Sequence, residues 1–324
     1  MRAMILAAGL GTRLRPLTLV RPKVLTPLAG AVTILEYWVS SLHRAGFESV
    51  VVNSFHLHEE LVRTVRNTDW PIPVEVLAEP VLLGTGGGLA NALDHFGGEP
   101  FAAVNGDIVC RLPLCDLHRE HEASGHPASL LLHDCPAFNN VAVDSRGFIL
   151  GFGREAFQLA GAGAGVRLLA FTGIHFIRPE ILQDLPRGVP GDILTVYRRL
   201  IAEGRPPKAL FSEGLYWREM GSLDAYRALT AELGKLPAGF LPPLATGRSV
   251  LAHPMTSIED GSRLTGVVAA GKGTRIMAGA EVENSILWDG VRVEPGARLR
   301  DCIVTDGVAV SGDHAGEIIT GKIG

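Results

Sequence analysis

The sequence has little of several features that mark other classes of protein. No apolar run among its 324 residues approaches the length of about 18 that a membrane-spanning helix needs. A net charge of −4 gives no basic excess, which argues against a general nucleic-acid binder. The four cysteines are scattered and form no C-x-x-C pair and no disulfide framework. We therefore expect a cytoplasmic protein with free thiols and with no nucleic-acid or membrane partner.

What is present predicts a globular chain of two domains. Apolar residues make up 47% of the sequence and charged residues 20%, which is enough to build a sizeable core. Strand patterns alternate with helix patterns over the first two-thirds of the chain. The expected strands are 4–6, 49–52, 74–77 and 101–104, and the expected helices include 33–45, 57–65, 89–93 and 117–122. Repeated β-α-β units predict a Rossmann-like, mostly parallel sheet with helices on both faces.

The pattern changes after residue 126. We expect a hairpin over 141–150, a long strand over 168–177 and an amphipathic helix over 192–203. From about residue 267 apolar residues recur six apart, which predicts stacked coils of a parallel β-helix. The spacing is irregular around 285–289. The predicted domains are a catalytic domain (1–234), a proline-containing linker (235–247) and the β-helix (248–324).

The stretch LAAGLGTRLRPLT, residues 6–18, is the strongest candidate for a binding site, and we call it the Gly-Arg loop. It leaves the first strand at the carboxyl edge of the sheet, where α/β folds bind ligands. Gly9 and Gly11 free the backbone N–H groups to approach an anion, and Arg13 adds a fork of donors. Leu14 replaces the third glycine of a dinucleotide fingerprint, and no G-K-[ST] follows. The loop therefore predicts a polyphosphate site of another kind.

Other residues strengthen this prediction. Lys23 lies between two prolines, which would hold its ammonium group in place. Asp107 follows the strand 101–104 at the same expected edge of the sheet, where its carboxylate could bind Mg²⁺ beside a polyphosphate. A second glycine run, 84–88, precedes a helix that we expect to start after it, and the bare backbone of the run suits a base or a sugar lying close to it.

Taken in order, the motifs LAAGLGTRLRPLT, RPKVLTPLAG, GTGGG, NGD and WREMGS resemble those of sugar-1-phosphate nucleotidyltransferases. The resemblance covers nearly the whole chain, including the terminal repeats, and it implies that these form a left-handed β-helix, as in many members of the family. It implies that a nucleoside triphosphate and a sugar 1-phosphate are the substrates and that Mg²⁺ is the cofactor. It assigns catalysis to Arg13, Lys23 and Asp107. It assigns nucleotide binding to Leu6, Ala8, Gly9, Gly11, Thr12, Glu79, Gly84 and Thr85, and sugar binding to Asn105, Thr172 and Gly173.

The chain departs from the family pattern at two places. Glu219 stands where the family usually has an aspartate as second metal ligand, so its side chain is one methylene longer. The family's Glu-Lys-Pro segment is missing, and Arg154 is the candidate to replace its lysine at the sugar phosphate. Gly221 would keep the backbone close beside Glu219.

The sequence leaves the substrates open. A carboxylate at Glu79 could accept both N–H donors of guanine, whereas uracil offers one, so we favour GTP with mannose 1-phosphate or a heptose 1-phosphate. The glycine run and the segment FTGI also resemble the branch that makes UDP-N-acetylmuramate. Uridylyl transfer is therefore the alternative, and CTP and dTTP remain open.

Two further classes compete with this hypothesis. The repeats could form an acyltransferase with His253 or His314 as base, but about 60 residues give few coils. We expect them instead to pack against the chain and to mediate a homo-oligomer. The altered Glu219 keeps a non-catalytic regulator open. His118 and His121 lie three apart on an expected polar helix, and we expect them to be solvated.

Overall fold

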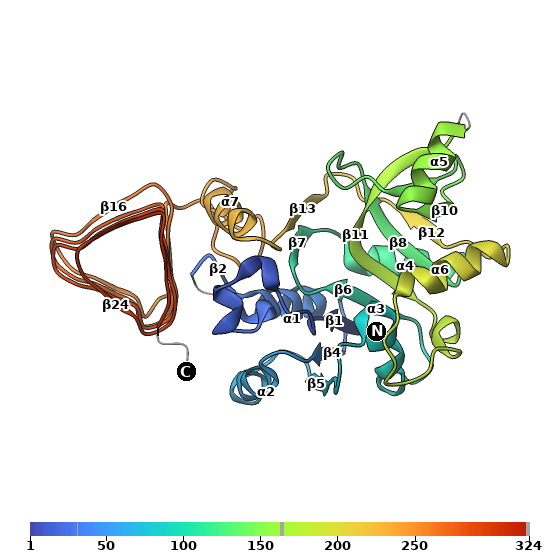
Figure 1. The fold of residues 1–324 in the computed structure, drawn as a ribbon, viewed down its shortest axis with the longest axis horizontal. Coiled ribbons are helices and arrows are strands. Elements are labelled where there is room, and N and C mark those ends of the chain that lie inside the picture. Colours follow the sequence, from blue (N-terminus) through green and yellow to red (C-terminus); the bar gives the residue numbers. More distant parts are fainter. Residues whose placement is uncertain (31, 163–164, 322–324) are drawn as a thin grey trace. The chain divides into compact units, whose positions relative to one another are not determined.

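The computed structural model describes residues 1–30, 32–162 and 165–321. Contacts divide the chain into two compact units, whose elements are labelled in Figure 1. Unit 1 comprises Met1–Gly9 and Leu42–Trp217, and unit 2 comprises Leu10–Ser41 and Arg218–Gly324. This division groups most of the Gly-Arg loop with the β-helix. The domain boundaries predicted from the sequence stay a prediction beside it.

Unit 1 is built on a nine-stranded mixed sheet. Its parallel half runs in the order β6-β1-β4-β5, with bounds Phe101–Asn105, Arg2–Leu6, Ser49–Ser54 and Val74–Ala78. The other half is organised around β11 (Arg167–Ile177), which is antiparallel to β6, β8 and β9. The remaining strands are β8 (Ala128–His133), β9 (Val141–Val143), β10 (Ile149–Phe152) and β12 (Lys208–Leu210). The α/β prediction is confirmed, with parallel pairing concentrated in the first half.

Among the residues that the structure describes, five α-helices lie wholly in unit 1: α2 (His58–Asn67), α3 (Gly84–Asn91), α4 (Leu114–Ser124), α5 (Arg154–Ala162) and α6 (Ile193–Ala202). Apolar residues of α3 and α6 form a core cluster with the sheet, and the rings of Phe96 and Phe101 stack in it with their centroids 3.7 Å apart. Helix α6 shows why the pattern folds as it does. The Asp192 side chain accepts a hydrogen bond from the Leu194 N–H at its start, and its apolar residues recur on one buried face.

Two predictions about helices are wrong. Helix α3 begins at Gly84, inside the glycine run, rather than after it. His118 and His121 are buried, with 1% and 0% exposure, rather than solvated. They share one face of α4 with Leu114 and Leu117, because residues three and four apart lie together on a helix. Both rings pack on Phe176, and His121 Nδ1 lies 2.8 Å from Ser129 Oγ.

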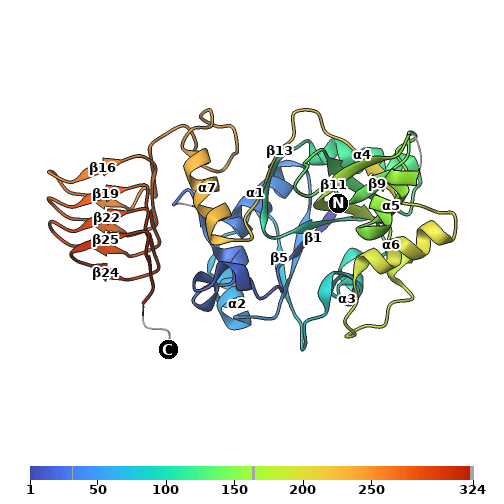
Figure 2. The ribbon, with the colours of Figure 1, turned by 45° about the horizontal axis from the view of Figure 1, so that its top comes forward.

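Unit 2 contains the predicted β-helix, and Figure 2 shows its coils stacked one on another. Three parallel sheets form its sides, in the orders β14-β17-β20-β23-β26, β15-β18-β21-β24 and β16-β19-β22-β25. The first side runs through Val250–Ala252, Val268–Ala270, Ile286–Leu287, Ile303–Val304 and Ile318–Ile319. The second runs through Ser257–Ile258, Arg275–Ile276, Arg292–Val293 and Ala309–Val310. The third runs through Arg263–Thr265, Glu281–Glu283, Arg298–Arg300 and Asp313–Ala315.

The irregular spacing around 285–289 has a physical cause. Leu251 pairs with Ala269, 18 residues later, whereas Ala269 pairs with Ile286, 17 residues later. One corner of each coil is turned by a single residue of left-handed conformation, Asn284 (φ 46°) or Asp301 (φ 52°) in successive coils. Asparagine and aspartate tolerate this conformation better than other side chains. Each such coil is therefore one residue shorter than a coil of three regular six-residue repeats.

The rest of unit 2 comprises short turns, a small hairpin and helices. The three 3₁₀ turns are Thr12–Leu14, Leu17–Leu19 and Lys23–Leu25, and β2 (Pro27–Leu28) pairs with β3 (Val32–Thr33). Helix α7 is Leu223–Leu233, and α1 is Ile34–Arg44, whose last turn falls in unit 1. Strand β13 (Tyr216–Glu219) crosses from one unit to the other and pairs with β7 (Ile108–Arg111). None of the described helices is both long and apolar enough to cross a membrane.

Two buried histidines predict that acid destabilises the fold. Burial lowers the pKa of His121 and of His175 from 6.5 to about 3. In the unfolded chain each imidazole takes up a proton below about pH 6.5, but in the fold it stays neutral until about pH 3. The free energy of unfolding should therefore fall as the pH drops from 6.5 toward 3, by about 1 kcal/mol per histidine between pH 6.5 and 5.5.

Urea unfolding at pH 6.5 and 5.5 checks this prediction. His121→Gln should lose less stability over that interval than the unmodified protein, whereas His43→Gln, at an exposed position, should lose as much. An equal loss in all three proteins would show that buried imidazoles do not cause the effect.

Candidate active site

In unit 1 two of the predicted site segments leave the sheet side by side. Strands β1 and β6 are parallel neighbours, with Leu6 opposite Asn105. The N–H of Gly106 donates to the Leu6 carbonyl at 2.9 Å, which fixes the turn before Asp107 against the start of the Gly-Arg loop. Ala8 is buried, and a Cβ placed on Gly9 would meet nothing within 4 Å. The backbone at Gly9 thus faces open space at the carboxyl edge of the sheet.

A chain of hydrogen bonds extends this edge toward Glu79. Asn53, in β4, accepts from the N–H of Ala7 at 2.6 Å and donates to Glu79 Oε1 at 2.7 Å. Glu79 Oε2 accepts from the N–H of Leu83 at 3.0 Å, and the residue is only 6% exposed. The carboxylate therefore holds the segment before α3 to the ends of β1 and β4. Each of its oxygens keeps one acceptor position for a ligand.

The glycine run of α3 is packed against the chain itself. A Cβ on Gly84, Gly86 or Gly87 would lie within 2.9 Å of backbone atoms in the segment 189–193. Thr85 Oγ1 accepts from the N–H of Ile193 at 3.1 Å and donates to Asp192 Oδ1 at 3.2 Å. The sequence suggests that a base or a sugar lies close to these glycines, but in the structure the chain's own backbone lies there. A base contact at Gly84 and Thr85 stays a prediction.

The structure brings two of the predicted sugar-binding residues together. Gly173 in β11 has a φ of 82°, and a Cβ there would lie 2.6 Å from Asn105 Nδ2 at the end of β6. Thr172 is buried beside them and donates to the Leu131 carbonyl at 2.8 Å. Arg154 is exposed at the first residue of α5 and forms no ion pair with another residue that the structure describes.

In unit 2 the Gly-Arg loop is shaped by one glycine and several buried leucines. Gly11 has a φ of 58°, and a Cβ there would lie 2.7 Å from Thr18 Cγ2, so the turn requires glycine. Thr18 Oγ1 donates to the Gly11 carbonyl at 2.9 Å. Leu14 and Leu17 are fully buried, whereas Thr12 and Arg13 are exposed. The local fold therefore presents the guanidinium of Arg13 to solvent on a fixed turn.

Arg13 pairs with a second residue that the sequence singled out. Its Nη2 lies 2.9 Å from Glu219 Oε1, and the arginine side chain is 67% exposed. A Cβ on Gly221 would overlap both groups, which explains why the position is glycine. An ion pair whose arginine is this exposed contributes at most about 1 kcal/mol to stability, so it holds Arg13 only weakly.

Sequence reasoning missed Arg21, which follows the Gly-Arg loop and joins this segment to the β-helix within unit 2. Its Nη2 lies 2.7 Å from Asp289 Oδ2 and its Nε 2.7 Å from Asp306 Oδ2. The guanidinium also lies over the Trp288 ring, 5.3 Å from its centre. Burial by itself lowers the pKa of Arg21, but the two carboxylates raise it above its ordinary value. The two aspartates occupy the same corner of successive coils, 17 residues apart, and this spacing was the only available signal.

A second contact fixes the same segment. The Tyr226 hydroxyl donates to the Pro27 carbonyl at 2.8 Å and accepts from Trp288 Nε1 at 3.1 Å. A Cβ on Gly30 would lie 2.3 Å from the Leu251 carbonyl oxygen. Residues 10–30, which carry Arg13 and Lys23, thus rest on the coils through Arg21, Tyr226 and direct backbone packing.

Together these features define a class of protein. It has an α/β sheet with glycine and acidic turns at its carboxyl edge, and a cationic loop held by a β-helix. Residues 2–139 match the family model described as nucleotidyl transferase, and residues 249–317 match that of the GlmU-like C-terminal hexapeptide.

Relatives of known activity match along most of the chain. N-acetylmuramate alpha-1-phosphate uridylyltransferase of Caulobacter vibrioides is 32% identical over 251 residues, which cover 72% of this chain and 97% of the relative. Mannose-1-phosphate guanylyltransferase of Mycobacterium tuberculosis is 27% identical over 299 residues, covering 89% and 80%. UTP–glucose-1-phosphate uridylyltransferase of Synechocystis is 28% identical over 328 residues, covering 89% and 83%. The chain belongs to the sugar-1-phosphate nucleotidyltransferase family.

Removing the Arg21 side chain should loosen the loop. Arg21→Ala leaves two half-buried carboxylates without their cation, which should cost about 2 kcal/mol of the free energy of unfolding. Hydrogen exchange should accelerate in residues 10–30. Urea unfolding and exchange mass spectrometry measure both effects. Arg15→Ala, an exposed position in the same loop, is the control and should change neither. Unchanged exchange in Arg21→Ala would contradict the anchoring role.

Proposed function

We propose that the protein transfers a nucleotidyl group from a nucleoside triphosphate to a sugar 1-phosphate, releasing pyrophosphate. Membership of the family carries the proposal, together with the exposed Arg13 on its glycine-shaped turn. The sugar phosphate oxygen attacks the α-phosphorus in line, opposite the pyrophosphate. This oxygen is already an anion, so the reaction needs no general base.

The chemistry instead demands positioning and charge cancellation. Two like unit charges about 4 Å apart repel by roughly 4 kcal/mol at an effective dielectric of 20, and each reactant carries more than one negative charge. In the proposal Arg13 binds the β- and γ-phosphates and so favours departure of pyrophosphate. Lys23 neutralises the phosphates around the reacting centre. The backbone of Gly9, Gly11 and their neighbours orients the triphosphate.

The donors for a magnesium ion are carboxylates. Asp107 is partly exposed after β6, and Glu219 keeps one oxygen beyond its pair with Arg13. No three acidic, histidine or cysteine side chains cluster as a metal site among the described residues. Two carboxylates nevertheless fit Mg²⁺, which proteins usually hold through one or two of them with substrate phosphates as further ligands. When bound, Mg²⁺ would offset phosphate charge, with Asp107 as its main protein ligand.

The proposed nucleotide is GTP, with UTP as the alternative. Glu79 could use its two remaining acceptor positions for the N1 and N2 donors of guanine, while Gly84 and Thr85 would line the base pocket. The relatives include both guanylyl and uridylyl transferases, so family membership alone does not choose between them. The proposed sugar site comprises Asn105, Thr172 and Gly173. Arg154 is proposed to take the role of the missing lysine.

Two further parts of the proposal concern the protein as a whole. We propose a homo-oligomer formed through the β-helix domain. The proposed location is the cytoplasm, where reducing conditions suit the four free cysteines.

One panel of reactions tests the function. Pyrophosphate release would be measured with Mg²⁺ for GTP, UTP, CTP, dTTP and ATP, each paired with the 1-phosphates of mannose, glucose, N-acetylglucosamine, N-acetylmuramate and heptose. We expect one strongly preferred pair. Silence across the panel with intact nucleotide binding would contradict the proposal and favour a regulator. Turnover of acetyl-CoA would favour an acyltransferase.

Arg13 and Asp107 should affect rate far more than stability. Arg13→Ala should lower kcat/KM by about 100-fold or more, because a charge-assisted phosphate contact is lost where negative charge develops. Asp107→Ala should lower it at least as much. Thermal unfolding should shift by no more than a few degrees in Arg13→Ala, since its side chain is largely exposed. Full activity in Asp107→Ala would overturn the metal assignment.

Glu79 should determine whether the protein prefers guanine or uracil. Glu79→Gln keeps the size of the side chain but replaces one acceptor oxygen with a donor, so it should weaken guanine binding more than uracil binding. We expect the ratio of kcat/KM for GTP to that for UTP to fall about tenfold, the loss of one hydrogen bond. Equal losses for both nucleotides would show that Glu79 acts only through its contacts with Asn53 and Leu83.

A further inference from the structure

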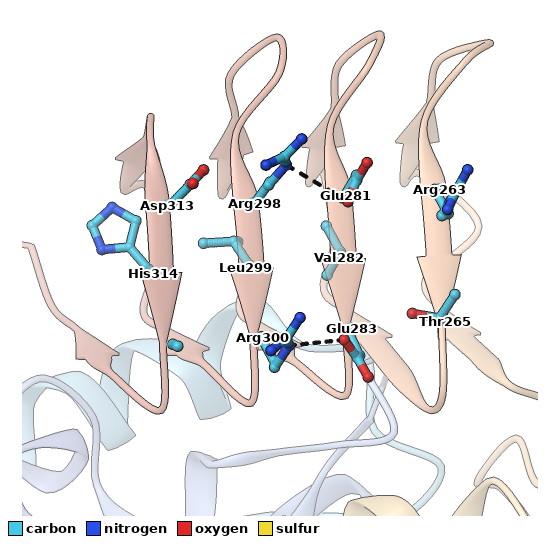
Figure 3. A pocket seen from close by; sticks show the side chains of 11 residues that line it. Arg263, Thr265, Glu281, Val282, Glu283, Arg298, Leu299, Arg300, Asp313 and His314 are labelled. Atoms are coloured by element: carbon cyan, nitrogen blue, oxygen red, sulfur yellow. Dashed lines mark hydrogen bonds and ion pairs between the residues drawn. The ribbon is translucent and has the colours of Figure 1, made fainter.

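The three sides of the β-helix differ sharply in what they expose. The side formed by β14, β17, β20, β23 and β26 is largely buried, and Trp288 and Asp289 beyond β20 hold Tyr226 and Arg21 of the same unit. The side of β15, β18, β21 and β24 places Arg275 next to Arg292 in its register. The third side, of β16, β19, β22 and β25, shows alternating charges (Figure 3).

The alternation follows the strand register. Residues at the same position of the four strands form a column across the face. In the first column Arg263 lies next to Glu281 in the register, Glu281 next to Arg298, and Arg298 next to Asp313. In the third column the order is Thr265, Glu283, Arg300 and Ala315. Among the middle residues Val282 and Leu299 are buried, whereas the two outer columns are exposed apart from the half-buried Glu283. They flank a hollow of about 330 Å³. We call this surface the charged face.

Ion pairs within the chain use only the middle charges of these columns. Arg298 lies 3.7 Å from Glu281, and Arg300 lies 3.0 Å from Glu283. Arg263 at one end and Asp313 at the other form no ion pair with a side chain that the structure describes. The charges of each column are thus complementary to themselves when the order of the column is reversed. The first column has Arg263 at one end and Asp313 at the other, whereas the third has the uncharged Thr265 and Ala315 at its ends.

We propose that the charged face binds the charged face of a second copy of this chain. A twofold axis parallel to the strands keeps each column opposite itself and reverses the order of the coils. Arg263 then faces Asp313 of the second copy, and Glu281 faces its Arg298. In the other outer column Glu283 faces Arg300. Every charge on the face meets its opposite, and the two unpaired end charges gain partners.

The alternative symmetric arrangement fails on the same residues. A twofold axis along the stack of coils would place Glu281 opposite Glu283, and Arg298 opposite Arg300. Like charges in contact across an interface cost several kcal/mol. Facing the second side of the β-helix against itself by the strand-parallel axis would oppose Arg275 and Arg292. Charge complementarity therefore selects one face and one orientation, with the two β-helices antiparallel.

The size of the face sets the strength of this dimer. Four strands about 4.8 Å apart and three residues long give roughly 200 Å² per copy, well below the 800 Å² or so of a standard interface. The dimer should therefore be weak and should depend on salt, because its charges are exposed to screening. This inference names the surface behind the proposed homo-oligomer and stands independently of the proposed reaction.

Sedimentation velocity over a range of protein concentrations tests the proposal. The protein should dimerise at low ionic strength (about 0.02 M) and dissociate at about 0.5 M. Glu281→Arg should weaken the dimer at least tenfold. Arg275→Glu, a charge reversal on the other exposed side, is the matched control and should not. A monomer at every concentration in low salt, or an unaffected dimer in Glu281→Arg, would overturn the proposal.

A charge exchange separates contacts between copies from contacts within the chain. The double variant Glu281→Arg/Arg298→Glu preserves the pair within each chain and the complement between two identical copies. In a mixed dimer of the variant and the unmodified protein, like charges would face each other at both positions. Energy transfer between labelled proteins should show that the variant associates with itself but not with the unmodified chain. If the variant associated with the unmodified chain as well as with itself, the charged face would be excluded as the interface. Pyrophosphate release should be unchanged in all these variants, so a failed interface is distinguished from a failed reaction.

Discussion

The placement of Arg21 between two carboxylates of the β-helix is the interaction on which the proposed chemistry depends. Lys23 follows it by two residues, and Arg13 precedes it on the same segment of unit 2. A cationic loop that binds a polyphosphate repels itself and would be costly to order without an anchor. Asp289 and Asp306 supply that anchor on successive coils, where the regular stacking fixes their spacing. The β-helix therefore supports residues 10–30, in addition to its proposed role as a surface for association.

Charged residues of the proposed active site also have partners within the chain. Arg13 is paired with Glu219 at an exposed position, so it is held in a defined place by an interaction weak enough to exchange. Glu79 holds the start of α3 through Asn53 and Leu83 while two acceptor positions remain on its carboxylate. In each case a residue that the resemblance assigns to a ligand also has a structural partner. Substituting either residue therefore affects the local geometry as well as the proposed binding.

Local pattern predicted much of this fold, and long-range contacts account for what it missed. The strand-helix alternation, the hairpin, the six-residue repeats and the Gly-Arg loop all follow from residues close in sequence. The pairing of Arg21 with Asp289 joins positions 268 residues apart, and no local signal marks it. The glycines of α3 serve packing against residues 189–193, which a motif cannot reveal. His118 and His121 were misjudged because composition made α4 look polar, whereas its spacing places them on the buried face.

The central claim is that the α-phosphorus of a nucleoside triphosphate is transferred to a sugar phosphate. The most direct test follows the label from triphosphate carrying ³²P at the α or at the γ position, with the preferred sugar 1-phosphate and Mg²⁺. The account predicts that the α label appears in the nucleotide-sugar and that the γ label appears in pyrophosphate. A γ label transferred to the sugar, or released as inorganic phosphate, would indicate a kinase or a hydrolase and would contradict the account.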